Sequence, residues 1–131
     1  MNKVWLHEIE QAIEGLSLPN LPQSLYEPFS YTMAMGGKRI RPYVTLLACG
    51  MVSGDHKHAM PVSLAVEVLH NFTLLHDDIM DDADTRRGIP CVHQKWNENI
   101  AILSGDVMYA YAFKQLLDYK ESNLLDKNQF T

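Results

Sequence analysis

The stretch His70–Gly88, "HNFTLLHDDIMDDADTRRG", joins an apolar run directly to a dense group of charges. Five aspartates fall between positions 77 and 84, and arginines follow at 86 and 87. The segment that leads into this group, 62–76, is apolar on nearly every side of a helical wheel, which predicts a buried helix. An acidic run that continues from a buried helix breaks the usual separation of core and surface, and such breaks point to function.

The spacing of the aspartates places two of them on one face of that helix. At about 100° per residue, Asp77 and Asp81 align, and Asp78 is a quarter-turn away. His70 lies on the same face two turns earlier. Like charges this close repel, and the C-terminal end of a helix is unfavourable for anions. A solvated acidic turn is one explanation, and a divalent cation is the other. Oxygen ligands favour Mg²⁺, with Mn²⁺ as the alternative ion, at Asp77, Asp78 and Asp81.

Two basic clusters accompany the aspartates. Arg86 and Arg87 follow them directly, and the planar guanidinium group matches phosphate oxygens. The segment 36–42, "GGKRIRP", contributes the second cluster: Lys38, Arg39 and Arg41. Its glycines let the backbone approach an anion, and Lys38 and Arg41 are spaced to bind one phosphate together. Alone, such a turn is also compatible with a simple helix stop. Together with the aspartates it predicts two anion sites, one bound through a metal and one bound directly by cations.

The rest of the sequence predicts an all-α protein. Its 131 residues are 47% hydrophobic and 21% charged, which fits one globular domain. Helical periodicity recurs along the chain, and no segment alternates like a strand. The expected helices cover residues 4–16, 24–35, 42–47, 59–82 and 100–119, with loops at 50–58 and 84–96.

Composition also excludes several classes of protein. The net charge of −5 argues against nucleic acid as a partner. The longest apolar stretch, 43–52, contains Gly50 and is far shorter than the roughly 20 residues of a transmembrane segment. Cys49 and Cys91 form no disulfide framework or metal-binding pair, which favours the reducing cytoplasm. The N-terminal residues lack the layout of a signal peptide.

Three motifs together resemble the N-terminal half of the trans-isoprenyl diphosphate synthases, the polyprenyl synthetase family. They are "GGKRIRP" at 36–42, "LLHDDIMDDADTRRG" at 74–88 and "VHQKWNENIAILSGD" at 92–106. The resemblance covers about residues 20–118. It implies a helical bundle of the isoprenoid (terpenoid) synthase type with a deep central cavity. It also implies a homodimer.

The resemblance further implies a role for each charged residue. The first aspartate-rich motif of the family, which holds Mg²⁺ on an allylic diphosphate, corresponds to Asp77, Asp78 and Asp81. Arg86 would contact the same allylic diphosphate. The residues that match the ligands of isopentenyl diphosphate are Lys38, Arg41, His70 and Arg87. The implied reaction ionises the allylic diphosphate and condenses it with isopentenyl diphosphate. Asp82 and Asp84 are expected to be surface or supporting groups.

Product length in this family depends on residues just before the aspartate motif, here Phe72 and Thr73. The helical wheel places Thr73 on the carboxylate face and Phe72 away from it, whereas the family gives weight to both positions. The expected product is a polyprenyl diphosphate of C15–C20.

The family also carries a second aspartate-rich motif, and these 131 residues do not contain one. We therefore expect residues 1–131 to form a single partial domain, inactive alone, with an apolar exposed surface. One alternative is a non-catalytic partner subunit of a prenyl synthase. The other is an HD-type metal phosphohydrolase, in which the His-Asp pair of "LLHDDI" would need further histidines: His56, His58 and His93.

Overall fold

The computed structural model describes the backbone of residues 1–121 and the side chains of residues 1–119. Its longer helices are α1 (Lys3–Glu14), α2 (Gln23–Ala34), α3 (Ile40–Ser53), α4 (Met60–Met80) and α6 (Glu98–Glu121). The shorter elements are the 3₁₀ helix η1 (His56–Ala59), strands β1 (Thr85–Arg86) and β2 (Ile89–Pro90), and helix α5 (Val92–Lys95). The predicted all-α fold class and its five helices are therefore confirmed.

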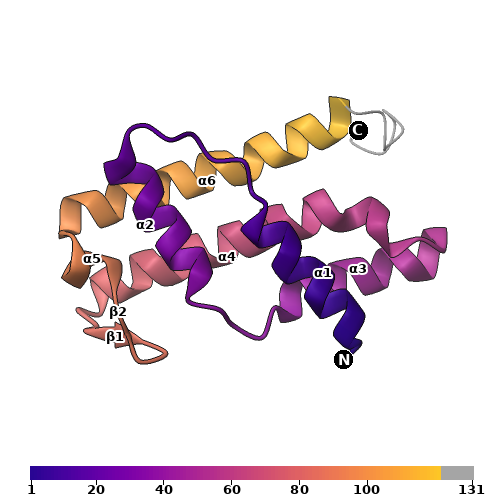
Figure 1. Ribbon diagram of the computed structural model, residues 1–131, viewed down its shortest axis with the longest axis horizontal. Coiled ribbons are helices and arrows are strands. Elements are labelled where there is room, and N and C mark those ends of the chain that lie inside the picture. The colour runs from indigo at the N-terminus through magenta and orange to yellow at the C-terminus, as the bar shows by residue number, and fades with distance from the viewer. Residues whose placement is uncertain (122–131) are drawn as a thin grey trace.

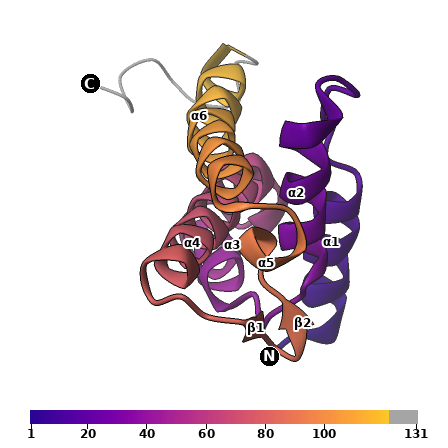
Figure 2. The same cartoon turned by 90° about the vertical axis from the view of Figure 1, so that its left-hand side faces the viewer.

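Helix α4 is the centre of the arrangement (Figure 1). Helix α6 lies along it, while α3, α2 and α1 pack against its other sides. Seen end-on, α1 and α2 form one side of the molecule, and the β1–β2 hairpin with α5 lies at one end (Figure 2). The continuous apolar character of α4 follows from this position, because a helix with neighbours on several sides needs apolar residues on several sides.

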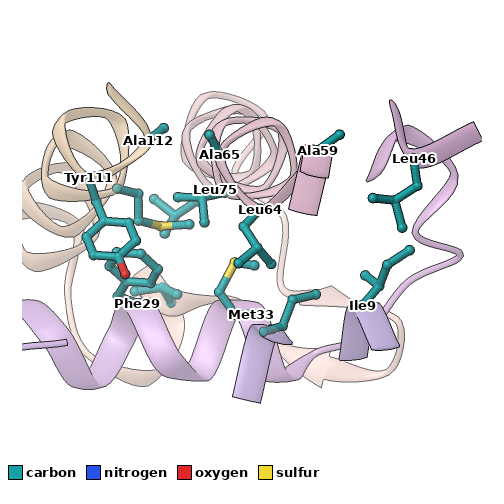
Figure 3. Packing of buried hydrophobic residues seen from close by; sticks show 14 of the residues in the cluster. Ile9, Phe29, Met33, Leu46, Ala59, Leu64, Ala65, Leu75, Tyr111 and Ala112 are labelled. Carbon is teal, nitrogen blue, oxygen red and sulfur yellow. The ribbon is translucent and has the colours of Figure 1, made fainter. Parts of the chain in front are cut away.

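The core joins these helices through a few large side chains (Figure 3). Phe29 of α2 meets Tyr111 of α6 edge to face, with ring centroids 5.3 Å apart. Ile9 of α1 lies against Leu46 of α3, and both are fully buried. The amphipathic patterns of α1 and α2 are thus explained by burial of one face of each helix against the α3–α4–α6 layer.

The C-terminal end of the third helix differs from the prediction. Helix α3 continues to Ser53, so the predicted loop at 50–58 is wrong in its first part, and η1 occupies most of the remainder. Gly50 is tolerated within the helix, and the helix ends at Gly54, whose φ of 80° is left-handed. Glycine adopts this conformation readily, so Gly54, and not Gly50, marks the end of the helix.

The predicted loop at 84–96 also has more structure than expected. Thr85 pairs with Pro90 and Arg86 with Ile89, which leaves Arg87 and Gly88 as a two-residue turn. Both turn residues have positive φ, 53° and 76°. This is the conformation that fits tight hairpins. The strands escaped prediction because two residues are too few to show an alternating pattern.

Exposed apolar side chains are most numerous on α3 and α6. On α3 they recur at helical spacing and form one stripe: Ile40, Val44, Leu47 and Met51. On α6 the largest are Tyr109, Phe113 and Leu117. No helix within residues 1–121 is both long and apolar enough to cross a membrane.

Gly105 of α6 faces the imidazole ring of His76 of α4. A Cβ atom at Gly105 would overlap the His76 imidazole. That ring is held by a 3.3 Å contact with the Ile102 carbonyl oxygen and by the Phe72 ring, 4.6 Å away between centroids. The close crossing of the two helices therefore requires glycine at this position.

Two glycine substitutions test this packing. Gly105→Ala should lower the free energy of unfolding by about 1–3 kcal/mol, because the added methyl group displaces His76. The matched control is Gly50→Ala in α3, where the nearest side-chain atoms are at an ordinary 3.6 Å. Gly50→Ala should raise the free energy of unfolding by up to about 1 kcal/mol, because alanine has a higher helix propensity than glycine. Urea denaturation measures both, and changes of the same sign would contradict the packing argument.

Candidate active site

One cavity of about 310 Å³ gathers the basic residues predicted to bind isopentenyl diphosphate. Its lining comes from the segment before α3, from the first turn of α3, from α4 and from the turn of the hairpin. The four residues singled out from the sequence all line it: Lys38, Arg41, His70 and Arg87. The structure therefore brings together residues that are up to 49 positions apart, 38 to 87, around one concave surface.

The glycines of "GGKRIRP" make this convergence possible. Gly36 and Gly37 have φ values of 82° and 142°, which residues with a side chain rarely adopt. A Cβ atom on Gly37 would lie 3.2 Å from Nη2 of Arg87. The absence of a side chain at position 37 therefore leaves room for the Arg87 guanidinium beside the segment before α3.

The contact with Arg41 fixes the tautomer of the His70 imidazole. Nη1 of Arg41 lies 3.1 Å from Nε2 of His70. Since arginine cannot accept a hydrogen bond, Nε2 of His70 accepts and its proton resides on Nδ1. Burial lowers the pKa of His70 below 6.5, and the charge of Arg41 lowers it further, while Glu67 opposes both. A neutral His70 leaves the cationic surface to Arg41, Lys38 and Arg87.

The three predicted metal ligands occupy two different environments. Asp78 is buried, and both of its oxygens are taken by Arg86: Nε donates to Oδ2 at 2.9 Å and Nη2 to Oδ1 at 2.7 Å. The Cys91 thiol donates to the same Oδ2 at 3.4 Å. Burial raises the pKa of Cys91 to about 11, so the thiol is protonated and can donate. Asp78 therefore anchors Arg86 in this structure.

Asp77 and Asp81 are exposed at the C-terminal end of α4. Among the described side chains, neither carboxylate has a hydrogen-bond or ionic partner. Both remain available to a cation. Asp82 is exposed as well, whereas Asp84 accepts from Nε2 of Gln94 at 3.3 Å and supports the loop before α5. Within residues 1–119, no three acidic, histidine or cysteine side chains are grouped closely enough to hold a metal by themselves.

The two residues expected to affect product length point in different directions. Phe72 packs against Tyr109 of α6, with ring centroids 5.4 Å apart, and against His76. Thr73 is exposed and its hydroxyl donates to the His70 carbonyl at 2.6 Å. Phe72 therefore belongs to the α4–α6 contact, and Thr73 lies on the open side of α4, as the helical wheel indicated.

Sequence reasoning missed a buried ionic network beneath the cavity. Arg39 donates to Glu10 and to Glu67, at 2.7 and 2.8 Å, and Asn71 also donates to Glu67 at 3.0 Å. The sequence contained one sign of this network: Glu67 and Asn71, a carboxylate and an amide, lie four residues apart in an otherwise apolar helix. Their burial with one partner arginine could not be inferred from periodicity.

The phosphohydrolase alternative finds no support in the arrangement of histidines. His56 pairs with Glu8 of α1 at 2.9 Å, and His76 faces α6. In the described part of the chain these histidines are not gathered around a common centre.

Comparison with known proteins identifies the family. The family model described as Polyprenyl synthetase matches residues 22–129. A geranylgeranyl diphosphate synthase of Methanosarcina mazei is 47% identical over 108 residues, which are 82% of this chain and 33% of that protein. The structure of a geranylgeranyl pyrophosphate synthetase from Geoglobus acetivorans matches with a TM-score of 0.82 at 40% identity. That match covers 87% of this chain and 37% of the other.

The chain therefore belongs to the polyprenyl synthetase family, and its helices form part of the all-α isoprenoid synthase fold. The resemblance noted in the sequence is confirmed. The chain spans about a third of the length of the curated relatives it matches. This coverage agrees with the expectation that these residues match only part of a family member.

Asp77 and Asp78 should respond differently to the same substitution. Asp78→Asn should lower the free energy of unfolding by about 1–3 kcal/mol, because it weakens the paired hydrogen bonds to a partly exposed Arg86. Asp77→Asn should change it by less than about 0.5 kcal/mol, toward higher stability, because it relieves repulsion with Asp81. Chemical denaturation compares the two variants. Equal losses would contradict the division between an anchoring and a free carboxylate.

His70 should make stability depend on pH below neutrality. Its folded pKa lies below 6.5, so the unfolded chain takes up the proton first as the pH falls. Stability is therefore lost as the pH decreases from 6.5 toward the folded pKa. The variant His70→Asn should show a smaller decrease between about pH 7.5 and pH 5.5. Other titrating groups are common to both proteins, so an identical pH dependence would exclude this effect.

Proposed function

We propose that these residues form part of a trans-prenyltransferase. This enzyme would condense isopentenyl diphosphate with an allylic diphosphate to give a longer polyprenyl diphosphate. The observation that carries this proposal is the cavity in which Lys38, Arg41, His70 and Arg87 meet, beside the carboxylates at the end of α4. The names of the relatives support the same reaction class. Cations on one side and free carboxylates on the other suit two diphosphates that bind in different ways.

The basic cavity is proposed to hold isopentenyl diphosphate. Lys38, Arg41 and Arg87 supply positive charge from three directions, which positions the diphosphate without a metal. Neutral His70 holds Arg41 and adds an N–H donor. Fixing the diphosphate in this way presents the double bond of the substrate to the allylic carbon, and this positioning accelerates the attack.

The carboxylates are proposed to face the allylic diphosphate. Asp77 and Asp81 fit Mg²⁺, because they are free oxygen ligands one helical turn apart and a bound diphosphate supplies further oxygens. When bound, the ion would neutralise charge on the departing diphosphate. Asp78 is assigned here to fixing Arg86, whose guanidinium can then stabilise the same departing charge. The allylic cation is attacked by the double bond, and a proton is then lost to the released diphosphate.

Product length is proposed to be C15–C20. Several of the relatives are named geranylgeranyl diphosphate synthase, and the geranylgeranyl group has twenty carbons, which supports the upper end of the range. Thr73 on the open side of α4 is too small to block a growing chain, whereas Phe72 is packed against α6. A homodimer, a cytoplasmic location and lack of activity in the 131 residues alone remain predictions.

Turnover with Mg²⁺, isopentenyl diphosphate and C5, C10 or C15 allylic primers tests the proposal. The assay compares the 131-residue chain with the longest product of its gene, and mass spectrometry identifies the products. Asp77→Asn or Asp81→Asn in an active protein should reduce turnover by about 10²-fold or more, because charge neutralisation at the leaving group is lost. Asp82→Asn is the matched control and should stay within about threefold of the parent activity.

Two outcomes would contradict the proposal. Unchanged turnover in both Asp77→Asn and Asp81→Asn would remove the metal assignment. Absence of product with every primer, in a folded protein that still binds isopentenyl diphosphate, would favour the non-catalytic partner subunit.

A further inference from the structure

We propose that Arg39 is a positioning residue of the diphosphate cavity. It is one of the residues that line the cavity, but its guanidinium donates to Glu10, Glu67 and the Met33 carbonyl and is therefore not available to a ligand. The proposal rests on the proposed function of that cavity. Arg39 stands between the two cavity residues Lys38 and Arg41 in the sequence, yet its side chain is only 2% exposed. A charged group so deeply buried is retained only with partners that compensate it.

The partners of Arg39 lie on three different helices. Nε donates to Oε1 of Glu10 on α1 at 2.7 Å, and Nη1 donates to Oε1 of Glu67 on α4 at 2.8 Å. Nη2 donates to the carbonyl oxygen of Met33 on α2 at 2.8 Å. One side chain thus ties the segment before α3 to all three of these helices. Asn71 holds Glu67 in place through its own donor at 3.0 Å.

The backbone at Arg39 shows what this anchor maintains. Its φ of 54° is left-handed, an uncommon conformation for a residue with a side chain. The turn places Lys38 before the bend and Arg41 in the first turn of α3, so that both line the cavity. Without the buried contacts, nothing in the local sequence would favour this conformation at position 39 over the ordinary right-handed one.

Arg39 also stands next to a negative charge that the cavity has to accommodate. Glu67 lines the same cavity as Lys38 and Arg41, and its side chain is 5% exposed. An unpaired carboxylate there would repel a diphosphate. Burial lowers the pKa of Arg39, but its hydrogen bonds with Glu10 and Glu67 outweigh this and raise it, so the guanidinium stays charged. The two effects of Arg39, turn geometry and charge, can be separated by experiment.

Binding of inorganic pyrophosphate, followed by isothermal titration calorimetry on the 131-residue chain without Mg²⁺, tests the proposal. Arg39→Gln should weaken binding by about tenfold or more. The double variant Arg39→Gln/Glu67→Gln, which removes the carboxylate charge as well, should remain weaker than the parent chain by about threefold or more, because the turn is still unanchored. Lys38→Ala is the positive control for a direct contact and should also weaken binding.

Glu10 supplies the decisive variant, because it contacts Arg39 but does not line the cavity. Its side chain is 42% exposed, so the fold should tolerate substitution. Glu10→Ala removes a negative charge and would strengthen binding of an anion if electrostatics alone mattered. We expect it to weaken binding by about threefold instead, whereas Glu10→Gln, which keeps an acceptor for Nε, should bind like the parent chain.

A stability control excludes a general loss of structure. Met108 is fully buried in α6 and does not line the cavity, so Met108→Ala should lower the melting temperature without changing the affinity for pyrophosphate. If Arg39→Gln does not fold, the comparison of Glu10→Ala with Glu10→Gln tests the proposal. Stronger or unchanged binding by Glu10→Ala would overturn the proposal, as would unchanged binding by Arg39→Gln.

The outcomes also separate this proposal from the proposed function. Absence of pyrophosphate binding by the parent chain overturns both. Binding that depends on Arg39 and Glu10, together with a failed turnover assay, supports the positioning role and overturns the prenyltransferase assignment. Binding and turnover that are both insensitive to Arg39 and Glu10 leave the function and overturn the positioning role.

Discussion

The buried ion pair between Arg39 and Glu67 is the interaction around which the basic cavity is built, and both residues line that cavity. The pair joins the segment before α3 to α4, at 2.8 Å, and it lies directly below the cationic surface. A buried charge without its partner would be unfavourable by several kcal/mol, so each of the two residues requires the other. The left-handed turn at Arg39 and the approach of Arg87 to Gly37 lie at the same junction, and His70 lines the cavity there from α4.

A second ion pair organises the opposite end of α4. Asp78 and Arg86 form two parallel hydrogen bonds, which orient a guanidinium plane more firmly than a single contact does. The tight turn at Arg87 and Gly88 then directs the next arginine toward the basic cavity. Adjacent arginines in the sequence thereby serve different environments, one beside the carboxylates and one beside Lys38. A hairpin of only two paired residues per strand is sufficient for this division.

Helix α4 combines the roles of core element and site element. Val68 and Leu75 are buried in the core, while His70, Asp77 and Asp81 reach the open side of the same helix. Because all of them lie on one rigid element, the spacing between the basic cavity and the carboxylates is set by the helix itself, at about 1.5 Å per residue. This rigidity suits the proposed reaction, in which two diphosphates would have to be held at a defined separation.

The sequence by itself determined the fold class and the order of the helices, and it predicted the residue types of the two proposed anion sites. Helical periodicity and the spacing of charged motifs are local properties, and His70, Asp77 and Asp81 could be placed on one face from them alone. The same information could not distinguish Asp78 from Asp77, or Arg39 from Arg41. Which of two neighbouring charges is buried depends on a counter-charge brought from a distant segment, and only the tertiary structure decided that Arg86 reaches Asp78 and that Glu10 and Glu67 reach Arg39.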